Sequence, residues 1–278
     1  MVSSESAASA GGGRGHGGRT WAFPCVRTGA IRLIDRPPTA TGSLRDPGTP
    51  PFGALGARDL VALSAESIAP AVSRPALAEA GERAFDIVFS LAVLALSAPV
   101  VAIAAILIRL DSPGPAFFRQ TRLGRNGHEF KLLKLRGMYI DAAERYPELY
   151  DYGLVRGVEG FCFHQGNDPR VTRVGKMLRR YSIDEIPNFW NVVRGEMRVV
   201  GPRPEIPELA RLYGDDLQTL LSVRPGVTSP AKARGRDLLT LDETLACDLA
   251  YISNRSFRLD LKTIVETVRT APRGTGTH

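Results

Sequence analysis

The feature that most constrains this chain is a run without charge from Ile87 to Ile108, built from Val, Leu, Ala, Ile and Phe with two serines and one proline. About 20 consecutive apolar residues are enough for a helix to cross the hydrocarbon of a bilayer. The run leaves no polar stripe along a helix, so a helix buried in a soluble core is the weaker interpretation. We therefore predict a membrane-inserted helix over residues 76–110.

The tripeptide Ser97-Ala98-Pro99 lies near the middle of this run. A proline inside a helix removes a backbone donor and clashes with the preceding turn, so it predicts a kink. Each half would then have about 10 residues and a length of roughly 15 Å, close to one leaflet. Because Arg83 precedes the run and Arg109 follows it, the positive-inside rule favours neither orientation. The pattern favours a re-entrant helix, broken near Ser97–Pro99, over a kinked spanning helix.

The segments on either side of this helix differ in composition. Residues 1–75 are rich in Gly, Ala, Ser, Pro and Arg, and such a segment buries too little apolar surface to become ordered. We predict a disordered tail there, with RNA binding through the Gly/Arg cluster Gly11–Gly18 as a weaker alternative. Residues 111–270 are expected to form a globular domain, and 271–278 a disordered C-terminus.

Charge and the positions of cysteine and histidine narrow the possible functions. The formal net charge of +7 fits anionic partners, such as phosphate-bearing ligands, nucleic acid or an anionic membrane face. The 3 cysteines form no Cys-x-x-Cys pair and the 4 histidines are scattered, which argues against a zinc site, a disulfide framework or a Ser-His-Asp triad. From Arg109 to Arg136, basic residues outnumber Asp111 and Glu129. This basic belt would suit lipid headgroups, and a merely solvated basic face is the alternative.

Local patterns after the apolar run predict a mixed fold. Asn126-Gly127 between two strand-like runs predicts a tight hairpin. Near the end, apolar residues at helical spacing suit either an amphipathic surface helix or a core-facing helix: Leu261, Ile264, Val265 and Val268. We expect an α+β, mostly helical fold, in which a membrane-associated globular domain follows an N-terminal re-entrant membrane helix and includes a small β-hairpin.

Two adjacent carboxylates, Asp184 and Glu185, lie in the segment Ser182–Pro187, and Arg203 follows between two prolines in Val200–Pro204. A carboxylate can attack phosphorus or hold Mg²⁺, and a rigidly framed guanidinium offers a fork for phosphate oxygens. The pattern therefore indicates phosphoryl transfer.

The same carboxylates have a structural alternative, because Ser182-x-x-Glu185 also fits a capping box at a helix start. Pro187 argues against it, since proline is disfavoured in the interior of the helix that would follow. A second functional class is a membrane-tethered basic binding protein without catalysis, but a purely cationic binder gains nothing from these carboxylates. Other groups suited to phosphate lie nearby in the sequence: Asn167–Arg170, Arg173, Arg179, Arg180 and Asn191.

From about Arg83 to Arg269 the chain resembles the bacterial sugar transferases, the monotopic polyprenol-phosphate phosphoglycosyl transferases. Each matching stretch is weakly specific alone, but their order and spacing together are highly specific. The stretches are Arg83–Ile87, Asp111–Pro115, Phe118–Gln120, Lys134–Met138, Asn167–Thr172, Ser182–Pro187, Val200–Pro204, Arg224–Thr228 and Asp248–Tyr251.

The resemblance implies transfer of a sugar 1-phosphate from a UDP-sugar to a polyprenyl phosphate of the undecaprenyl phosphate class, with release of UMP. It implies the initiating step of exopolysaccharide, capsule or glycoconjugate synthesis. It also implies Mg²⁺ as a cofactor. The membrane would be a partner of the protein, and nucleic acid would not. The phosphoglycosyl transferase domain would span residues 111–270 and lie on the cytoplasmic face of the bacterial inner membrane.

Carried onto this sequence, the resemblance assigns roles to individual residues. Asp184 would attack the β-phosphorus and form an aspartyl-phosphosugar intermediate, and Glu185 would bind Mg²⁺. Substrate phosphates would be bound by Lys134 and Arg203, with Arg236 and Asp248 as weaker candidates.

Two departures from the usual family pattern lie near these residues. Ser229-Pro230-Ala231-Lys232 stands where related chains more often carry Gly-Leu-Ala-Gln, which adds a cation and a proline. Gly137 stands where a serine is common. Both departures bear on the acceptor or the sugar more than on the reaction.

Overall fold

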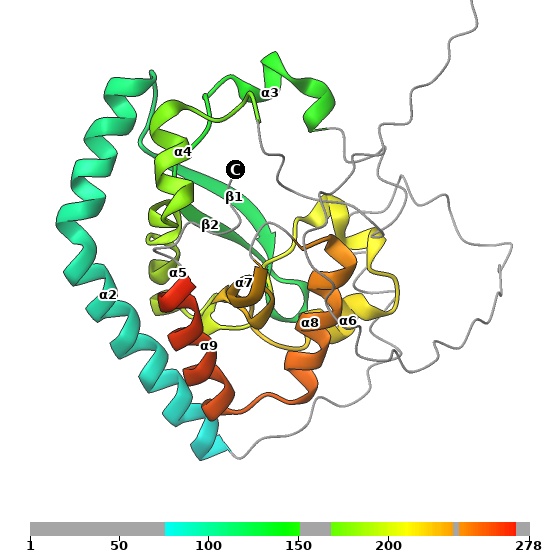
Figure 1. Cartoon of the computed structure of the whole chain (residues 1–278). Helices are drawn as coiled ribbons and strands as arrows, with labels where there is room; N and C mark the ends of the chain where they lie inside the picture. The colour runs from blue at the N-terminus through cyan, green and yellow to red at the C-terminus, as the bar shows by residue number, and fades with distance from the viewer. Residues whose placement is uncertain (1–75, 151–167, 236–238, 271–278) are drawn as a thin grey trace, which may run out of the picture.

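The computed structural model describes residues 76–150, 168–235 and 239–270 (Figure 1). The disorder predicted over 1–75 and 271–278 lies outside these residues, and so does Arg236. The described part is mostly helical with two small sheets, which agrees with the predicted α+β class.

The first described element is the helix α2, Ala76–Asp111, which runs along one side of the domain (Figure 1). By length and composition it could cross a membrane. Only 11% of its most apolar 18-residue window is buried, which argues against the alternative of a buried core helix. Its exposed apolar surface indicates membrane association.

Pro99 lies inside α2 without interrupting it. We predicted a broken helix, whereas the structure has one continuous helix whose axis changes direction within its length (Figure 1). The hydroxyl of Ser97 donates to the Val93 carbonyl oxygen at 2.6 Å, a contact that commonly bends helices. Because proline removes only one helical hydrogen bond, the neighbouring turns stay helical and the element bends rather than breaks.

The three elements after α2 form the predicted hairpin, with the 3-10 turn η3 (Arg125–Gly127) between its two strands. Strands β1 (Phe117–Leu123) and β2 (Glu129–Leu135) pair antiparallel, with Phe117 opposite Leu135 and Leu123 opposite Glu129. The connection contains Asn126 and Gly127 at φ values of 58° and 75°. This left-handed turn is the one that Asn-Gly favours, so the hairpin prediction is confirmed.

The other elements build the body of the domain around a second, parallel sheet of β3 (Arg198–Val200) and β4 (Gly226–Thr228). A Cβ on Gly226 would lie 2.1 Å from the Gly201 nitrogen, so only glycine permits this close approach. The remaining elements are α3 (Ala142–Arg145), η4 (Pro147–Leu149), α4 (Arg173–Arg180), η6 (Ile183–Glu185), α5 (Asn188–Arg194), η7 (Pro207–Leu212), α6 (Asp216–Leu221), α7 (Pro230–Gly235), α8 (Leu241–Ser253) and α9 (Phe257–Thr270).

Both ends of α2 are attached to this one domain. Near the start of α2, Arg83 donates to the Val192 carbonyl oxygen at the end of α5, at 2.7 Å. At its last residue, Asp111 accepts a 3.0 Å hydrogen bond from the Val174 backbone at the start of α4. Between these attachments Leu96 is 82% exposed. The helix therefore leaves the domain surface and returns to it.

A buried ionic network holds the first half of α2. Arg198 of β3 pairs with Glu82 at 3.0 Å and Asp86 at 2.9 Å on α2, and with Asp260 on α9 at 3.2 Å. The Tyr251 hydroxyl of α8 donates to Asp260 at 2.7 Å. Buried charges are tolerated only when they are paired in this way. One arginine therefore joins the apolar helix, the second sheet and the C-terminal helix.

Apolar packing also connects the hairpin, the second sheet and α9. One cluster, which includes Leu132 and Val199, lies between the hairpin and the second sheet, and Ile264 of α9 packs against it. On α9, Ile264 faces the core, but the other three apolar residues of the predicted periodic row are exposed. Thus α9 is core-facing on one side and presents an apolar row to its surroundings: Leu261, Val265 and Val268.

We predict that Arg198→Met destabilises the fold by about 3–5 kcal/mol, because three buried carboxylates lose their common partner. The matched control is Arg194→Met, since Arg194 is exposed and its surface pair with Glu196 contributes less than about 1 kcal/mol. Thermal unfolding of both variants in detergent measures the difference. Equal melting temperatures would contradict the role given to Arg198.

Candidate active site

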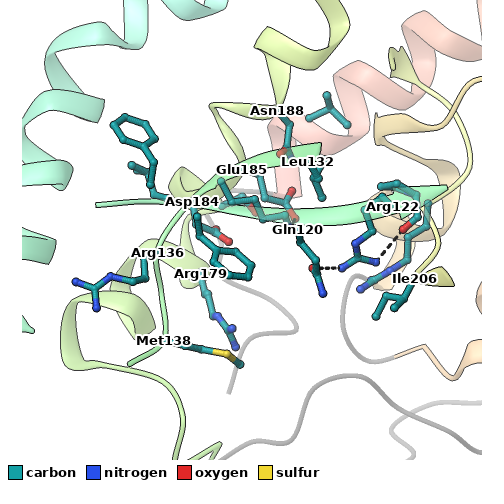
Figure 2. A pocket seen from close by; sticks show the side chains of 18 of the residues that line it. Gln120, Arg122, Leu132, Arg136, Met138, Arg179, Asp184, Glu185, Asn188 and Ile206 are labelled. Carbon is teal, nitrogen blue, oxygen red and sulfur yellow. Dashed lines mark hydrogen bonds and ion pairs between the residues drawn. The ribbon is translucent and has the colours of Figure 1, made fainter. Parts of the chain in front are cut away.

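The predicted carboxylates line a cavity of about 550 Å³ between the β1–β2 hairpin, η6 and the β4–α7 segment. Figure 2 shows Asp184 and Glu185 in the middle of the lining residues, with Arg122 toward one end and Arg136 toward the other. Of the predicted phosphate-binding residues, Lys134 and Arg203 also line this cavity. The fold therefore brings together four residues from three separate parts of the sequence.

A strained turn presents the two carboxylates. Asp184 and Glu185 lie in the short 3-10 helix η6, and Ser182 just before it has a φ of 54°. A non-glycine residue in the left-handed region is uncommon and often marks a functional site. Ser182 makes no side-chain cap hydrogen bond at this position, so the capping box considered for Ser182-x-x-Glu185 is not formed.

Glu185 is held by two lysines. Its Oε1 lies 3.1 Å from the Lys134 Nζ, and its Oε2 pairs with the Lys232 Nζ. Lys232 also donates to the Val227 carbonyl oxygen at 3.1 Å. The sequence marked Lys232 only as an unusual residue for this segment, and the structure places its ammonium inside the site.

Burial lowers the pKa of Lys134 to about 8, although the nearby Asp184 carboxylate opposes this change. The cations Arg122, Arg203 and Arg179 lower it further. At neutral pH most Lys134 side chains remain charged. Several cations held this close together favour a ligand that carries several negative charges.

Arg203 lies in the loop that follows β3, and contacts on the side away from the cavity hold this loop in place. The Arg203 backbone N–H donates to Asp248 Oδ2 at 2.9 Å, and Asp248 is only 1% exposed. Arg122 donates to the Pro204 carbonyl oxygen at 2.9 Å and to Gln120 at 2.7 Å. Asp248 does not line the cavity, so it is placed to support the loop rather than to contact a phosphate.

Two further cations of the cavity, Arg122 and Arg136, were not predicted as site residues. Arg122 and Arg136 belong to the basic belt, but they are 7% and 5% exposed. The headgroup interpretation is therefore wrong for these two. In the sequence, these two arginines are indicated only by the excess of basic residues. That excess does not show which side chains line the cavity. Among the described residues, two carboxylates and seven cationic side chains line the cavity, the cations being Arg122, Lys134, Arg136, Arg170, Arg179, Arg203 and Lys232.

Two of the nearby groups suited to phosphate have structural partners. Arg170 pairs with Asp168 at 2.8 Å. Asn191 is buried and donates to Lys131 and Glu196, while it accepts from the Leu133 backbone. These contacts fix loops and join α5 to β2.

The carboxylates fit a metal ion only in company with a substrate. Among the described residues, no group of three or more His, Cys, Asp and Glu side chains could hold a metal ion. In nucleotide sites Mg²⁺ is commonly held by one or two carboxylates together with substrate phosphates. Asp184 and Glu185 therefore suit a Mg²⁺ ion that arrives with a diphosphate.

Burial raises the pKa of Asp248 to about 7, so this carboxyl is protonated in the folded protein between about pH 4 and 7 while the unfolded chain is ionised. Its contribution to the unfolding free energy is therefore present below about pH 4 and is lost as the pH rises to about 7. We predict that Asp248→Asn, which does not ionise, gains stability relative to the wild type over this range, by an amount on the order of 4 kcal/mol at most.

Thermal unfolding of wild type and Asp248→Asn at pH 4, 5.5, 7 and 8 tests this linkage. The difference in melting temperature should change steadily up to about pH 7 and then level off. A difference that does not vary with pH would contradict it.

The chain is similar to a family of known proteins. The sequence model for the bacterial sugar transferases matches residues 77–274. A UDP-glucose:undecaprenyl-phosphate glucose-1-phosphate transferase of Caulobacter vibrioides is 38% identical over 203 residues, which cover 67% of this chain and 68% of that protein.

Two further relatives are longer proteins. A UDP-galactose-lipid carrier transferase of Erwinia amylovora is 34% identical over 188 residues, 67% of this chain and 39% of that protein. A UDP-N-acetylgalactosamine-undecaprenyl-phosphate N-acetylgalactosaminephosphotransferase of Aeromonas hydrophila is 33% identical over 201 residues, 70% of this chain and 44% of that protein. The chain thus spans about two fifths of the length of these two relatives. Because the family model matches most of the length of this chain, the chain belongs to the bacterial sugar transferase family.

Proposed function

We propose that the chain transfers a sugar 1-phosphate from a UDP-sugar to a polyprenyl phosphate of the undecaprenyl phosphate class and releases UMP. The observation that carries the proposal is the cavity itself, in which two carboxylates lie among seven cations, in a domain that also carries a long apolar helix. The names of the relatives support a sugar phosphate as the group transferred and a lipid phosphate as the acceptor. Such a reaction would begin the synthesis of an exopolysaccharide, capsule or glycoconjugate.

In the first step, a carboxylate oxygen of Asp184 attacks the β-phosphorus of the UDP-sugar. A new bond forms between Asp184 and phosphorus, and the bond from this phosphorus to the bridging oxygen breaks, so UMP leaves with that oxygen. Lys134 and Arg203 lie in the same cavity, where their charges would neutralise the diphosphate and the departing phosphate. Glu185 would hold Mg²⁺, which would add further charge neutralisation at the leaving nucleotide.

In the second step, a phosphate oxygen of the lipid attacks the same phosphorus and displaces the Asp184 carboxylate. The product is a polyprenyl diphosphate-linked sugar, and Asp184 is regenerated. The cavity has an apolar side suited to a lipid, because Phe117, Phe118 and Ile140 line it and are 44%, 48% and 60% exposed. The β1 strand that carries the two phenylalanines begins shortly after α2 ends.

The attachment of α2 supports a re-entrant topology with both ends on the cytoplasmic face of the inner membrane. A spanning helix would place its flanks on opposite sides of roughly 30 Å of hydrocarbon. Here Arg83 and Asp111, which bracket the apolar run, both hydrogen-bond to the same domain. Attachment of both flanks to one domain favours a helix that enters and leaves the membrane on the same side.

We predict that Asp184→Asn lowers UMP release from a UDP-sugar, measured with Mg²⁺ and polyprenyl phosphate, by at least about 10³-fold, because the amide cannot form the covalent intermediate. Asp215→Asn, at an exposed position outside the cavity, is the control and should retain activity. A panel of UDP-sugars in the same assay identifies the donor. Full activity in Asp184→Asn would refute the nucleophile, and no UMP from any donor would favour a binding protein without catalysis.

The topology is tested by labelling single cysteines on the two flanks of the apolar run. Glu79→Cys and Pro113→Cys both lie at exposed positions, and Cys25, Cys162 and Cys247 are replaced by serine in the background. We expect a membrane-impermeant thiol reagent to reach both positions from the same side of inverted vesicles. Labelling from opposite sides would establish a spanning helix.

A further inference from the structure

Lys232 enters the site through a local structure that its neighbours build. It is the third residue of α7, and its backbone N–H donates to the Ser229 hydroxyl at 3.2 Å, as at a capped helix start. Pro230 occupies the first helical position, where proline is favoured. Ser229, Pro230 and Lys232 therefore act together: the serine and the proline begin the helix, and the lysine reaches back into the cavity.

The ammonium of Lys232 is fixed on Glu185. It pairs with Oε2 of Glu185 and donates to the Val227 carbonyl oxygen at 3.1 Å, while Lys134 lies 3.1 Å from Oε1. Both carboxylate oxygens of Glu185 thus have a cationic partner. The side chains of Lys232 and Glu185 are only 25% and 22% exposed, so water screens this pair less than a surface pair.

This arrangement opposes a metal ion in the ligand-free enzyme. Mg²⁺ would have to bind a Glu185 oxygen at about 2.0–2.1 Å, with an ammonium next to the same carboxylate. Two cations at this separation repel each other strongly in a partly buried site. Lys232 must therefore leave Glu185 before a metal ion can bind there.

A diphosphate changes the balance, because it brings negative charges that can accept both the metal ion and the displaced ammonium. We propose that Lys232 is a tethered cation that holds Glu185 in the ligand-free enzyme and moves to a substrate phosphate when the nucleotide diphosphate and the metal ion bind together. Lys232 thereby makes metal binding depend on the nucleotide, as a coupling between two ligands. This inference rests on the proposed function for the identity of the nucleotide.

The test compares metal binding and nucleotide binding in Lys232→Met, which keeps the aliphatic length of the side chain and removes its charge. Binding of Mn²⁺ to the purified full chain, without nucleotide, is followed by electron paramagnetic resonance. Binding of UDP is followed by calorimetry in saturating Mg²⁺, the condition in which Lys232 would be free to contact the diphosphate. We expect Lys232→Met to bind Mn²⁺ at least about tenfold more tightly than the wild type, and UDP several-fold more weakly.

Two controls separate this effect from a general disturbance. Lys176→Met removes a lysine at an exposed position of α4 outside the cavity and should leave both affinities unchanged. The double variant Lys232→Met/Glu185→Gln should lose the gain in Mn²⁺ affinity, because the gain arises at the freed Glu185 carboxylate. A merely structural effect would weaken both ligands in Lys232→Met.

Manganese affinity in Lys232→Met equal to or weaker than that of the wild type overturns the inference, and so does a gain that survives Glu185→Gln. UMP release by the wild type is measured on the same preparations. UMP formation with an unchanged metal affinity in Lys232→Met refutes the role of Lys232 and leaves the proposed function standing. A tenfold gain in metal affinity without UMP formation from any donor supports Lys232 and refutes the proposed function.

Discussion

The buried guanidinium of Arg198 is the interaction on which the rest of the structure depends. It pairs with Glu82 and Asp86 of α2 and with Asp260 of α9, so it joins the apolar helix to the two-stranded sheet and to the C-terminal helix. A charge at 5% exposure is stable only because its partners surround it, and those partners are equally buried. Apolar packing alone would allow α2 to slide or rotate on the domain, whereas this network fixes one position.

The same network is connected to the candidate active site through β3. Arg198 begins the strand that leads into Gly201-Pro202-Arg203-Pro204, and the close approach of Gly201 to Gly226 holds this loop against β4. On the side of the loop away from the cavity, Asp248 accepts a hydrogen bond from the Arg203 backbone N–H. Strand β3 therefore connects α2, through Arg198, to the loop that carries Arg203. In the proposed reaction, this connection would hold the nucleotide and the lipid phosphate near the same carboxylate.

Much of this could be predicted from the sequence where the signal is local. The apolar run, the Asn126-Gly127 turn and the Asp184-Glu185 pair each lie in one continuous stretch of sequence, so the residues within that stretch determine what it forms. The remainder depends on contacts between distant segments. Glu185 and Lys232 are 47 residues apart, and no periodicity connects them. Arg122 belongs to the basic belt, and the sequence of this belt does not show which side chains are buried. The continuity of α2 through Pro99 depends on the helical hydrogen bonds that the neighbouring turns retain.

In the proposed reaction, Asp184 carries the transferred sugar phosphate covalently. This step is tested by incubating the protein with its UDP-sugar and Mg²⁺ but without lipid acceptor, followed by intact-mass spectrometry and peptide mapping. We expect a mass increase equal to one sugar phosphate, located on the peptide that contains Asp184 and removed by polyprenyl phosphate. If the protein releases UMP in the presence of lipid but never gains this mass, or gains it on another residue, Asp184 is not the nucleophile.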